Sequence, residues 1–297
     1  MILETNNLTK RFGRLTAVNK VNLRIPEGSI FGMLGPNGSG KTTTLGMLLG
    51  VINPTEGEFS WFGQGNSPEI RKNIGAILEQ PIFYPYMSAV RNLDIVCKIK
   101  QAATSRIETV LKQVNLFDRK DDKFETYSLG MKQRLAIASA LLCDPKVLVL
   151  DEPTNGLDPQ GIAEIRQIIS NIAASGKSII LASHLLDEVQ KVCTDFCVLQ
   201  NSNLIYQGSV AEDFAENTSI EIASVNHSAL KTALTKISGV KDVIEQGQII
   251  LVKGDDELDS LSLNQQLIER GVVVSHLKTI EKSLEQRFLE ILEGQND

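Results

Sequence analysis

The sequence predicts an α/β protein with a parallel sheet in its main part and a smaller α+β domain after it. Three observations support this prediction. Short, continuous apolar runs alternate with helical spacing over the first two thirds of the 297 residues. A glycine-rich loop directly follows one of these runs, at the position where open α/β sheets carry their sites. Beyond about residue 210, shorter segments of alternating apolar and polar residues take over.

Continuous apolar runs predict the strands of the main sheet, because strands buried on both faces of a parallel sheet have this pattern. The runs lie at 30–34, 147–150 and 179–182. Helical spacing of apolar residues predicts helices over 41–49, 135–142 and 162–172. The alternation of the two kinds of segment is typical of an α/β fold with helical crossovers.

The C-terminal part predicts a different architecture. Strands are expected at 220–222, 240–245, 249–252 and 272–274. Helices are expected over 229–237 and 258–268, with a final helix over 280–292. The resulting order β-α-β-β-α-β resembles a ferredoxin-like sandwich with one added helix.

The charge is unevenly divided along the chain, which carries a net charge of −6. Residues 211–297 contain 16 acidic and 8 basic side chains, whereas residues 1–210 contain 20 acidic and 22 basic ones. This shift predicts two domains, 1–210 and 211–297. The acidic second part argues against a nucleic-acid-binding surface there, because such surfaces need basic side chains.

The composition also limits the location of the protein. No stretch approaches the roughly 18–20 uninterrupted apolar residues of a membrane span, and the N-terminus lacks the basic and apolar regions of an export signal. The four cysteines lack the paired spacing of a zinc site. We therefore expect a cytoplasmic protein with reduced thiols, and any role at the membrane is expected to be peripheral or through a partner.

One segment fits the phosphate-binding pattern G-x-x-x-x-G-K-[ST], known as Walker A, without a gap. Its residues are Gly35, Pro36, Asn37, Gly38, Ser39, Gly40, Lys41 and Thr42. The backbone of such a loop binds phosphate, the lysine reaches the outer phosphates and the threonine hydroxyl can bind Mg²⁺. Thr43 is included in the predicted nucleotide site. The alternative is an ordinary glycine-rich turn before a helix.

The predicted strand over 147–150 ends in two carboxylates, Asp151 and Glu152. In a nucleotide hydrolase, Asp151 would hold Mg²⁺ and Glu152 would act as the general base for the attacking water. The alternative is a charged turn after a strand. The phosphate loop upstream argues against this alternative. No Asn-Lys-x-Asp motif for reading guanine is present.

Between these two motifs, the segment Tyr-Ser-Leu-Gly-Met at 127–131 resembles the signature Leu-Ser-Gly-Gly-Gln of the ATP-binding cassette (ABC) ATPases. Ser128 and Gly130 match, whereas Leu129 and Met131 replace a glycine and the glutamine. This form resembles a variant of bacterial drug and peptide exporters, of the bacitracin or lantibiotic type. Ser128 is also a good N-cap, so an ordinary capped helix is the alternative.

Further residues resemble the family's motifs in the expected order. Asp158, in the sequence Asn-Gly-Leu-Asp-Pro, resembles the D-loop at the dimer seam, and His184 resembles the switch histidine that contacts the γ-phosphate. Phe12 has the position of the aromatic ring that stacks on adenine, and a buried core aromatic is its alternative. In the Q-loop region, Glu79 is the match by position and Gln80 the match by chemistry for a residue near Mg²⁺.

The resemblance covers residues 2–208 and implies a P-loop NTPase fold with an antiparallel β subdomain and a helical subdomain. It implies that two copies close over two ATP-Mg²⁺ and thereby drive export of a drug or peptide through separate transmembrane permease subunits. The aromatic segment 81–87 would be either an anchor for such a subunit or part of the core. The alternative function is a soluble ABC ATPase of the translation or DNA-repair type.

Overall fold

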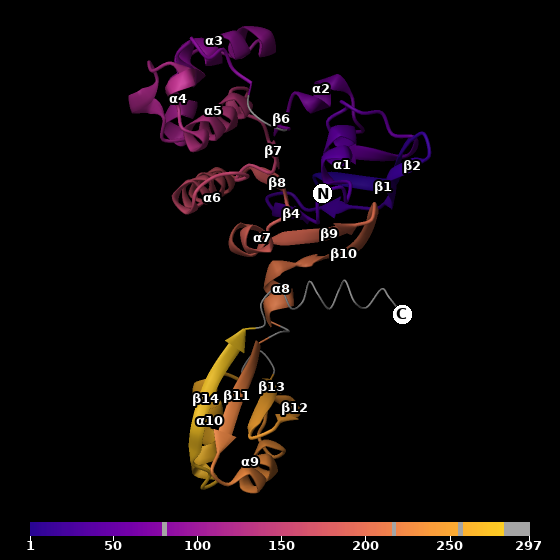
Figure 1. Ribbon diagram of the computed structural model, residues 1–297. Coiled ribbons are helices and arrows are strands. Elements are labelled where there is room, and N and C mark those ends of the chain that lie inside the picture. The colour runs from indigo at the N-terminus through magenta and orange to yellow at the C-terminus, as the bar shows by residue number, and fades with distance from the viewer. Residues whose placement is uncertain (79–81, 216–217, 255–257, 282–297) are drawn as a thin grey trace. The chain divides into compact units, whose positions relative to one another are not determined.

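The chain consists of two compact units, Met1–Gly208 and Ser209–Asp297. They are seen in a computed structural model that describes residues 1–78, 82–215, 218–254 and 258–281 (Figure 1). Each unit has a hydrophobic core of its own. Within the described ranges, no helix combines the length and the apolar character that crossing a membrane requires.

The first unit is built on a six-stranded sheet with the order β10-β9-β4-β8-β7-β6. Its strands are β4 (Ile30–Leu34), β6 (Ile74–Ile77), β7 (Val147–Asp151), β8 (Ser178–Ser183), β9 (Asp195–Gln200) and β10 (Asn203–Ser209). The central strands pair in parallel, and every residue of β4, β7 and β8 is buried. The three strands predicted from apolar runs are therefore confirmed.

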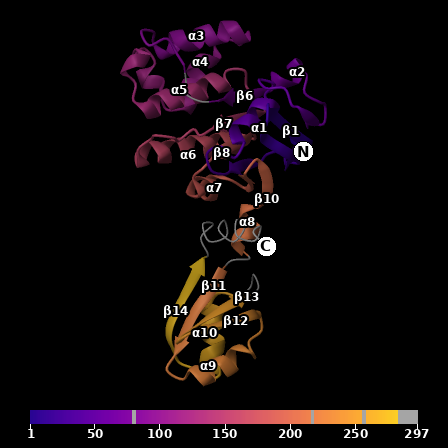
Figure 2. The same cartoon turned by 45° about the vertical axis from the view of Figure 1, so that its right-hand side comes forward.

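Helices connect the strands and cover the sheet (Figure 2). They include α1 (Lys41–Leu48), α5 (Leu129–Leu141), α6 (Pro159–Ala174) and α7 (Leu186–Val192). Helices α5 and α6 begin before the predicted residues, because Ser128 and Asp158 cap them by accepting hydrogen bonds from Met131 N and Gly161 N. The apolar spacing alone could not show these first turns, because their apolar residues do not follow the helical period of the rest of each helix.

The expected antiparallel subdomain is formed by β1 (Leu3–Phe12), β2 (Leu15–Val21), β3 (Arg24–Ile25) and β5 (Glu56–Trp61). Residue Leu3 lies opposite both Ile25 and Trp61 in the register. The buried Trp61 ring donates a hydrogen bond from Nε1 to the Leu48 carbonyl at the end of α1, 2.9 Å away. This bond ties the subdomain to the helix that follows the phosphate loop.

The expected helical subdomain follows β6 and contains α3 (Ala89–Lys100) and α4 (Arg106–Gln113) beside α5 (Figure 1). Two short 3₁₀ helices, Phe117–Arg119 and Phe124–Thr126, connect α4 to α5. A further single-turn helix, α2 (Pro68–Arg71), precedes β6. The second 3₁₀ helix thus leads directly to Ser128, the N-cap of α5.

The second unit has the predicted β-α-β-β-α-β order after a short helix, α8 (Val210–Ala215). Its elements are β11 (Thr218–Ser224), α9 (His227–Leu234), β12 (Val240–Gln246), β13 (Ile249–Gly254), α10 (Ser260–Glu269) and β14 (Val274–Glu281). The sheet order β12-β13-β11-β14, antiparallel throughout, is that of a ferredoxin-like sandwich. Ile222, Leu230 and Val252 are in its buried core.

The largest boundary errors in this unit concern its last strand and its last predicted helix. The last strand starts at Val274 and not at residue 272, because the Val272 amide donates to Leu267 O and closes the end of α10. The predicted helix over 280–292 does not begin at Ile280, which instead pairs with Ser219 in the sheet. The rest of that helix, from residue 282, lies outside the described residues.

Candidate functional site

The predicted phosphate loop lies between the end of β4 and the start of α1. Its backbone leaves no room for side chains at two glycines. A Cβ on Gly35 would lie 2.3 Å from Leu199 O, and one on Gly40, which has a φ of +105°, would lie 2.5 Å from Ala17 O. The loop therefore requires glycine there, as a backbone cradle for phosphate does.

Polar groups of the loop also fit a phosphate ligand. Ser39 Oγ is buried and makes no hydrogen bond to any residue that the structure describes, although a buried hydroxyl normally has a hydrogen-bond partner. Lys41, whose side chain is only 5% exposed, donates from Nζ to Gly35 O at 2.7 Å and Pro36 O at 3.3 Å. The loop thus holds a buried ammonium group against its own carbonyls, next to amides that can bind an anion.

The second residue of α1, Thr42, is joined to the end of β7. Its hydroxyl donates a hydrogen bond to Asp151 Oδ2 at 2.7 Å. The two residues are brought together because β4 and β7 both pair with β8 and end at the same edge of the sheet. A hydroxyl and a carboxylate at this distance form a donor set that suits Mg²⁺.

Glu152 connects the phosphate loop to the predicted switch histidine. Its Oε1 lies 3.3 Å from Lys41 Nζ, and its Oε2 lies 2.8 Å from His184 Nδ1. Glu152 has a positive φ of 48°, which is uncommon for a non-glycine residue and is found most often at functional sites. The three predicted residues, which span more than 100 positions of the sequence from Lys41 to His184, therefore form one contact chain.

The signature and D-loop residues form a separate hollow of about 420 Å³. Ser128, Gly130 and Asp158 are among its lining residues. The phosphate loop, which the structure describes in full, contributes no lining residue to it. One copy of the chain therefore brings together Lys41, Thr42, Asp151, Glu152 and His184. Its signature residues line a different hollow.

The remaining predicted residues differ in what the structure shows of them. Phe12, at the end of β1, is 49% exposed, with Lys10 Nζ 5.0 Å from the centre of its ring. The alternative of a buried core aromatic is therefore wrong. Thr43 lies in the first turn of α1. Glu79 and Gln80 lie outside the described residues.

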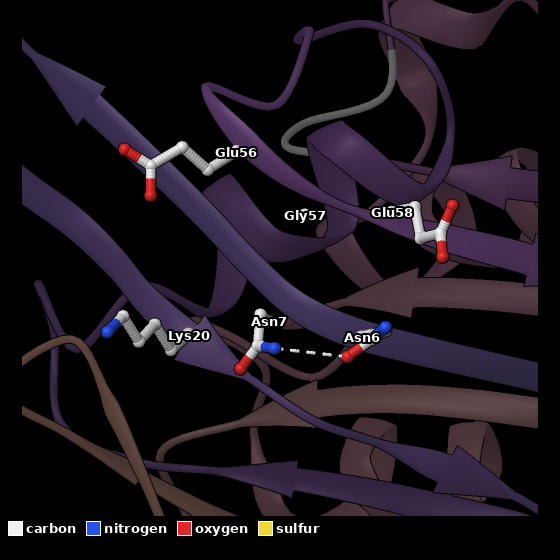
Figure 3. Close-up of a pocket in the computed structure, with 6 residues that line it drawn as sticks. All are labelled: Asn6, Asn7, Lys20, Glu56, Gly57 and Glu58. Atoms are coloured by element: carbon white, nitrogen blue, oxygen red, sulfur yellow. Dashed lines mark hydrogen bonds between the residues drawn. The ribbon is translucent and has the colours of Figure 1, made fainter.

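A second hollow, of about 500 Å³, lies on the antiparallel subdomain and contains none of the predicted site residues. Asn6, Asn7, Lys20, Glu56, Gly57 and Glu58 line it (Figure 3). Figure 3 shows the carboxylates of Glu56 and Glu58 pointing away from each other. They do not converge on a common ligand, and Glu56 is already paired with Arg11.

Comparison with known proteins shows which family the chain belongs to. The family described as "ABC transporter" matches residues 18–155. The bacitracin transport ATP-binding protein BcrA of Enterococcus faecalis is 34% identical, over 99% of this chain and 97% of that protein. The chain belongs to the ABC transporter ATP-binding family. The lantibiotic transport ATP-binding protein SrtF of Streptococcus pyogenes is another relative, 39% identical over 70% of this chain and 89% of SrtF.

Solved structures confirm the ABC ATPase fold. CbiO1 from Clostridium perfringens, part of the ABC transporter complex CbiONQ, aligns with a TM-score of 0.65 and 29% identity, over 72% of this chain and 91% of CbiO1. A dimeric ATP-binding cassette, MJ0796, bound to ADP and Pi, aligns with a TM-score of 0.63 and 26% identity, over 70% of this chain and 99% of MJ0796.

The chain is thus an ATP-binding subunit of an ABC transporter, and such subunits are ATPases coupled to transport. These relatives give no support to the soluble translation or repair class.

Sequence reasoning missed one polar residue beside the site, the buried Glu188 on α7. The sequence did carry a signal for it. Glu188 lies four residues after His184, in a short helix, and directly precedes the buried Val189.

Proposed function

We propose that this chain hydrolyses Mg²⁺-ATP between two of its copies and thereby powers export of a peptide or drug through separate transmembrane subunits. The contact chain Lys41–Glu152–His184 is the observation that supports this best. In it, a buried cation, a carboxylate and an imidazole converge where the strands of the sheet end. This is the arrangement that activation of water beside a γ-phosphate requires.

Each residue of the site has a proposed role. The loop amides and Lys41 hold the phosphates, and Glu152 takes the proton of the attacking water. His184, bound to Glu152 at 2.8 Å, orients that carboxylate and reaches the γ-phosphate. Thr42 and Asp151 would hold Mg²⁺, which neutralises phosphate charge when bound. The exposed Phe12 ring would stack on adenine, and Glu79 or Gln80 would approach the metal.

The separation of the signature from the phosphate loop supports dimerisation. Ser128 caps α5, and its hollow offers the amides of a helix N-terminus to an anion that the same copy's phosphate loop does not hold. In a face-to-face pair, Ser128, Gly130 and Asp158 of one copy would complete the site of the other. The similar cassette MJ0796, solved as a dimer, supports pairing of two copies.

An exposed segment before α3 supports docking to a transmembrane subunit at the inner face of the membrane. Ile82 is 95% exposed, and the neighbouring Tyr84 and Tyr86 rings are also exposed. Asn92 fixes the segment by accepting from Tyr84 N at 2.8 Å and donating to Tyr84 O at 3.1 Å. Such fixed, exposed apolar side chains are suited to an interface.

The names of the relatives BcrA and SrtF support antimicrobial peptides as the transported class.

We assign ATP hydrolysis to a domain of residues 1–210 and an accessory role to residues 211–297. A chain that ends at residue 208 should bind ATP within about threefold of the full chain, because all proposed ATP ligands precede that residue. Equilibrium binding of a fluorescent ATP analogue tests this, and loss of binding would contradict the division.

The central test is ATPase activity of the full-length chain with Mg²⁺, together with its oligomeric state. Activity should rise with the square of protein concentration at low concentration, because two copies form each site. ATP should shift the chain from monomer to dimer in size-exclusion chromatography when hydrolysis is blocked. Full specific activity in a strictly monomeric preparation would contradict the proposal.

A further inference from the structure

A buried carboxylate that none of the proposed roles uses lies beside the catalytic loops. Glu188, on α7, is only 1% exposed. Its Oε2 accepts a hydrogen bond from the Ser183 hydroxyl at 2.7 Å, and its Oε1 accepts one from the Thr154 hydroxyl. Burying a carboxylate is costly unless hydrogen bonds replace its water. The two hydroxyl groups supply those bonds.

Both partners of Glu188 belong to segments that carry a proposed catalytic residue. Ser183 is the last residue of β8 and directly precedes His184, whereas Thr154 lies two residues after Glu152. The same two segments are joined by a backbone bond from the Glu152 amide to the end of β8, at 3.0 Å. Glu188 therefore links the base-bearing loop to the histidine-bearing loop through one side chain.

The helix that carries Glu188 is fixed in place. At Gly32 on β4, a Cβ would lie 2.9 Å from the Val189 side chain, so only glycine permits this approach of α7 to the sheet. On its other side, Asp187 accepts a hydrogen bond at 2.7 Å from Arg166 on α6. Because α7 is held by both β4 and α6, the Glu188 carboxylate is a rigid support for the two loops.

The hydrogen bonds at this position suit a carboxylate. The hydroxyl of Ser183 accepts a hydrogen bond from Leu185 N at 3.0 Å, so its proton is directed to Glu188. The Thr154 hydroxyl also donates to Glu188. The two hydroxyls donate to different oxygens of Glu188, and glutamine would place an NH₂ donor at one of these two positions.

We propose that Glu188 is a positioning residue for ATP hydrolysis: by holding Thr154 and Ser183 together, it sets the distance between Glu152 and His184. This inference rests on the proposed function, in which those two residues act at the γ-phosphate. Misplacement of a catalytic group by about 1 Å can cost about 100-fold in rate, which is why one buried support matters.

Glu188→Gln in the full-length chain is the direct test, with Thr154→Val as a second way to remove one arm. We expect kcat to fall by about 10- to 100-fold in both variants. The Kd for ATP should stay within about threefold, since neither residue contacts the phosphate loop. Thr154→Ser keeps the hydroxyl and should recover most of the kcat that Thr154→Val loses. Glu58→Gln, at an exposed glutamate of the antiparallel subdomain, is the matched control.

Three outcomes would overturn the inference. One is wild-type kcat in Glu188→Gln. The second is an equal loss of kcat, ATP affinity and Tm, which would make Glu188 a purely structural residue. The third is equal activity of Thr154→Ser and Thr154→Val, which decides the matter even if Glu188→Gln does not fold.

Glu152→Gln, assayed in parallel, separates this inference from the proposed function. If the wild-type chain turns over, Glu152→Gln does not and Glu188→Gln is unaffected, only the positioning role of Glu188 is wrong. If the wild-type chain has no ATPase activity, both are overturned.

Discussion

Replacing Glu152 by glutamine separates chemistry from binding in this site. The side chain keeps its size and one acceptor oxygen, but it loses the negative charge that lies 2.8 Å from His184 Nδ1 and 3.3 Å from Lys41 Nζ. An amide cannot take a proton from water. Loss of a general base costs about 10²- to 10⁴-fold in rate, which corresponds to about 3–5 kcal/mol of activation free energy.

The same substitution should not weaken ATP binding, although it slows hydrolysis. The attraction between Lys41 and Glu152 at 3.3 Å is about 5 kcal/mol at an effective dielectric constant of 20. Desolvation of the two groups offsets most of it, but ATP must still compete with Glu152 for Lys41. Glu152→Gln removes this competition, so we expect ATP affinity that is unchanged or up to about tenfold tighter.

Phosphate release from Mg²⁺-ATP measures turnover, a fluorescent ATP analogue measures affinity, and size-exclusion chromatography with ATP measures dimerisation. The expected variant has almost no turnover, retains ATP and is dimeric. Glu58→Gln, which makes the same chemical change at an exposed site, should match the wild type in all three assays. Turnover within about threefold of the wild type would refute the role of Glu152 as base, and weaker binding would refute the argument from Lys41.

Three further predictions concern the phosphate loop, the thiols and the response to acid. Lys41→Ala should weaken ATP binding by about 30-fold or more, because it removes the buried cation that phosphate would bind; calorimetric titration measures this. Burial raises the pKa of the Cys193 thiol, so iodoacetamide should alkylate the exposed Cys143 in the native chain and reach Cys193 only after unfolding, as mass spectrometry can show. A hydrogen bond from Lys177 lowers the pKa of Asp144 below the ordinary value of an aspartate side chain. Its contribution to stability is present above that value and is lost as the pH falls through the folded-state pKa, so Asp144→Asn should lower the Tm slightly at neutral pH and not in strong acid.

The main-sheet strands and the phosphate loop were predictable because their signals are local. An apolar run of four or five residues bounded by glycine or a carboxylate identifies a buried strand, as at β4 and β7. The errors arose where long-range pairing overrides local spacing. Ile280 belongs to an apolar pattern of helical period, yet it continues β14 because β11 offers it a partner. Likewise, the spacing of apolar residues in α5 and α6 did not reveal the first turns of these helices.

By itself, the sequence determined the family of the chain and most of its candidate site, because each motif is a contiguous string whose backbone geometry is local. Only the tertiary structure decided which residues meet. The order β4-β8-β7 places Thr42 against Asp151 and His184 against Glu152. The same strand order brings Glu188 to Thr154, 34 positions away, a contact that no spacing along the chain encodes. The physical reason is that pairing in a parallel sheet joins segments whose separation in the sequence is set by the intervening helices.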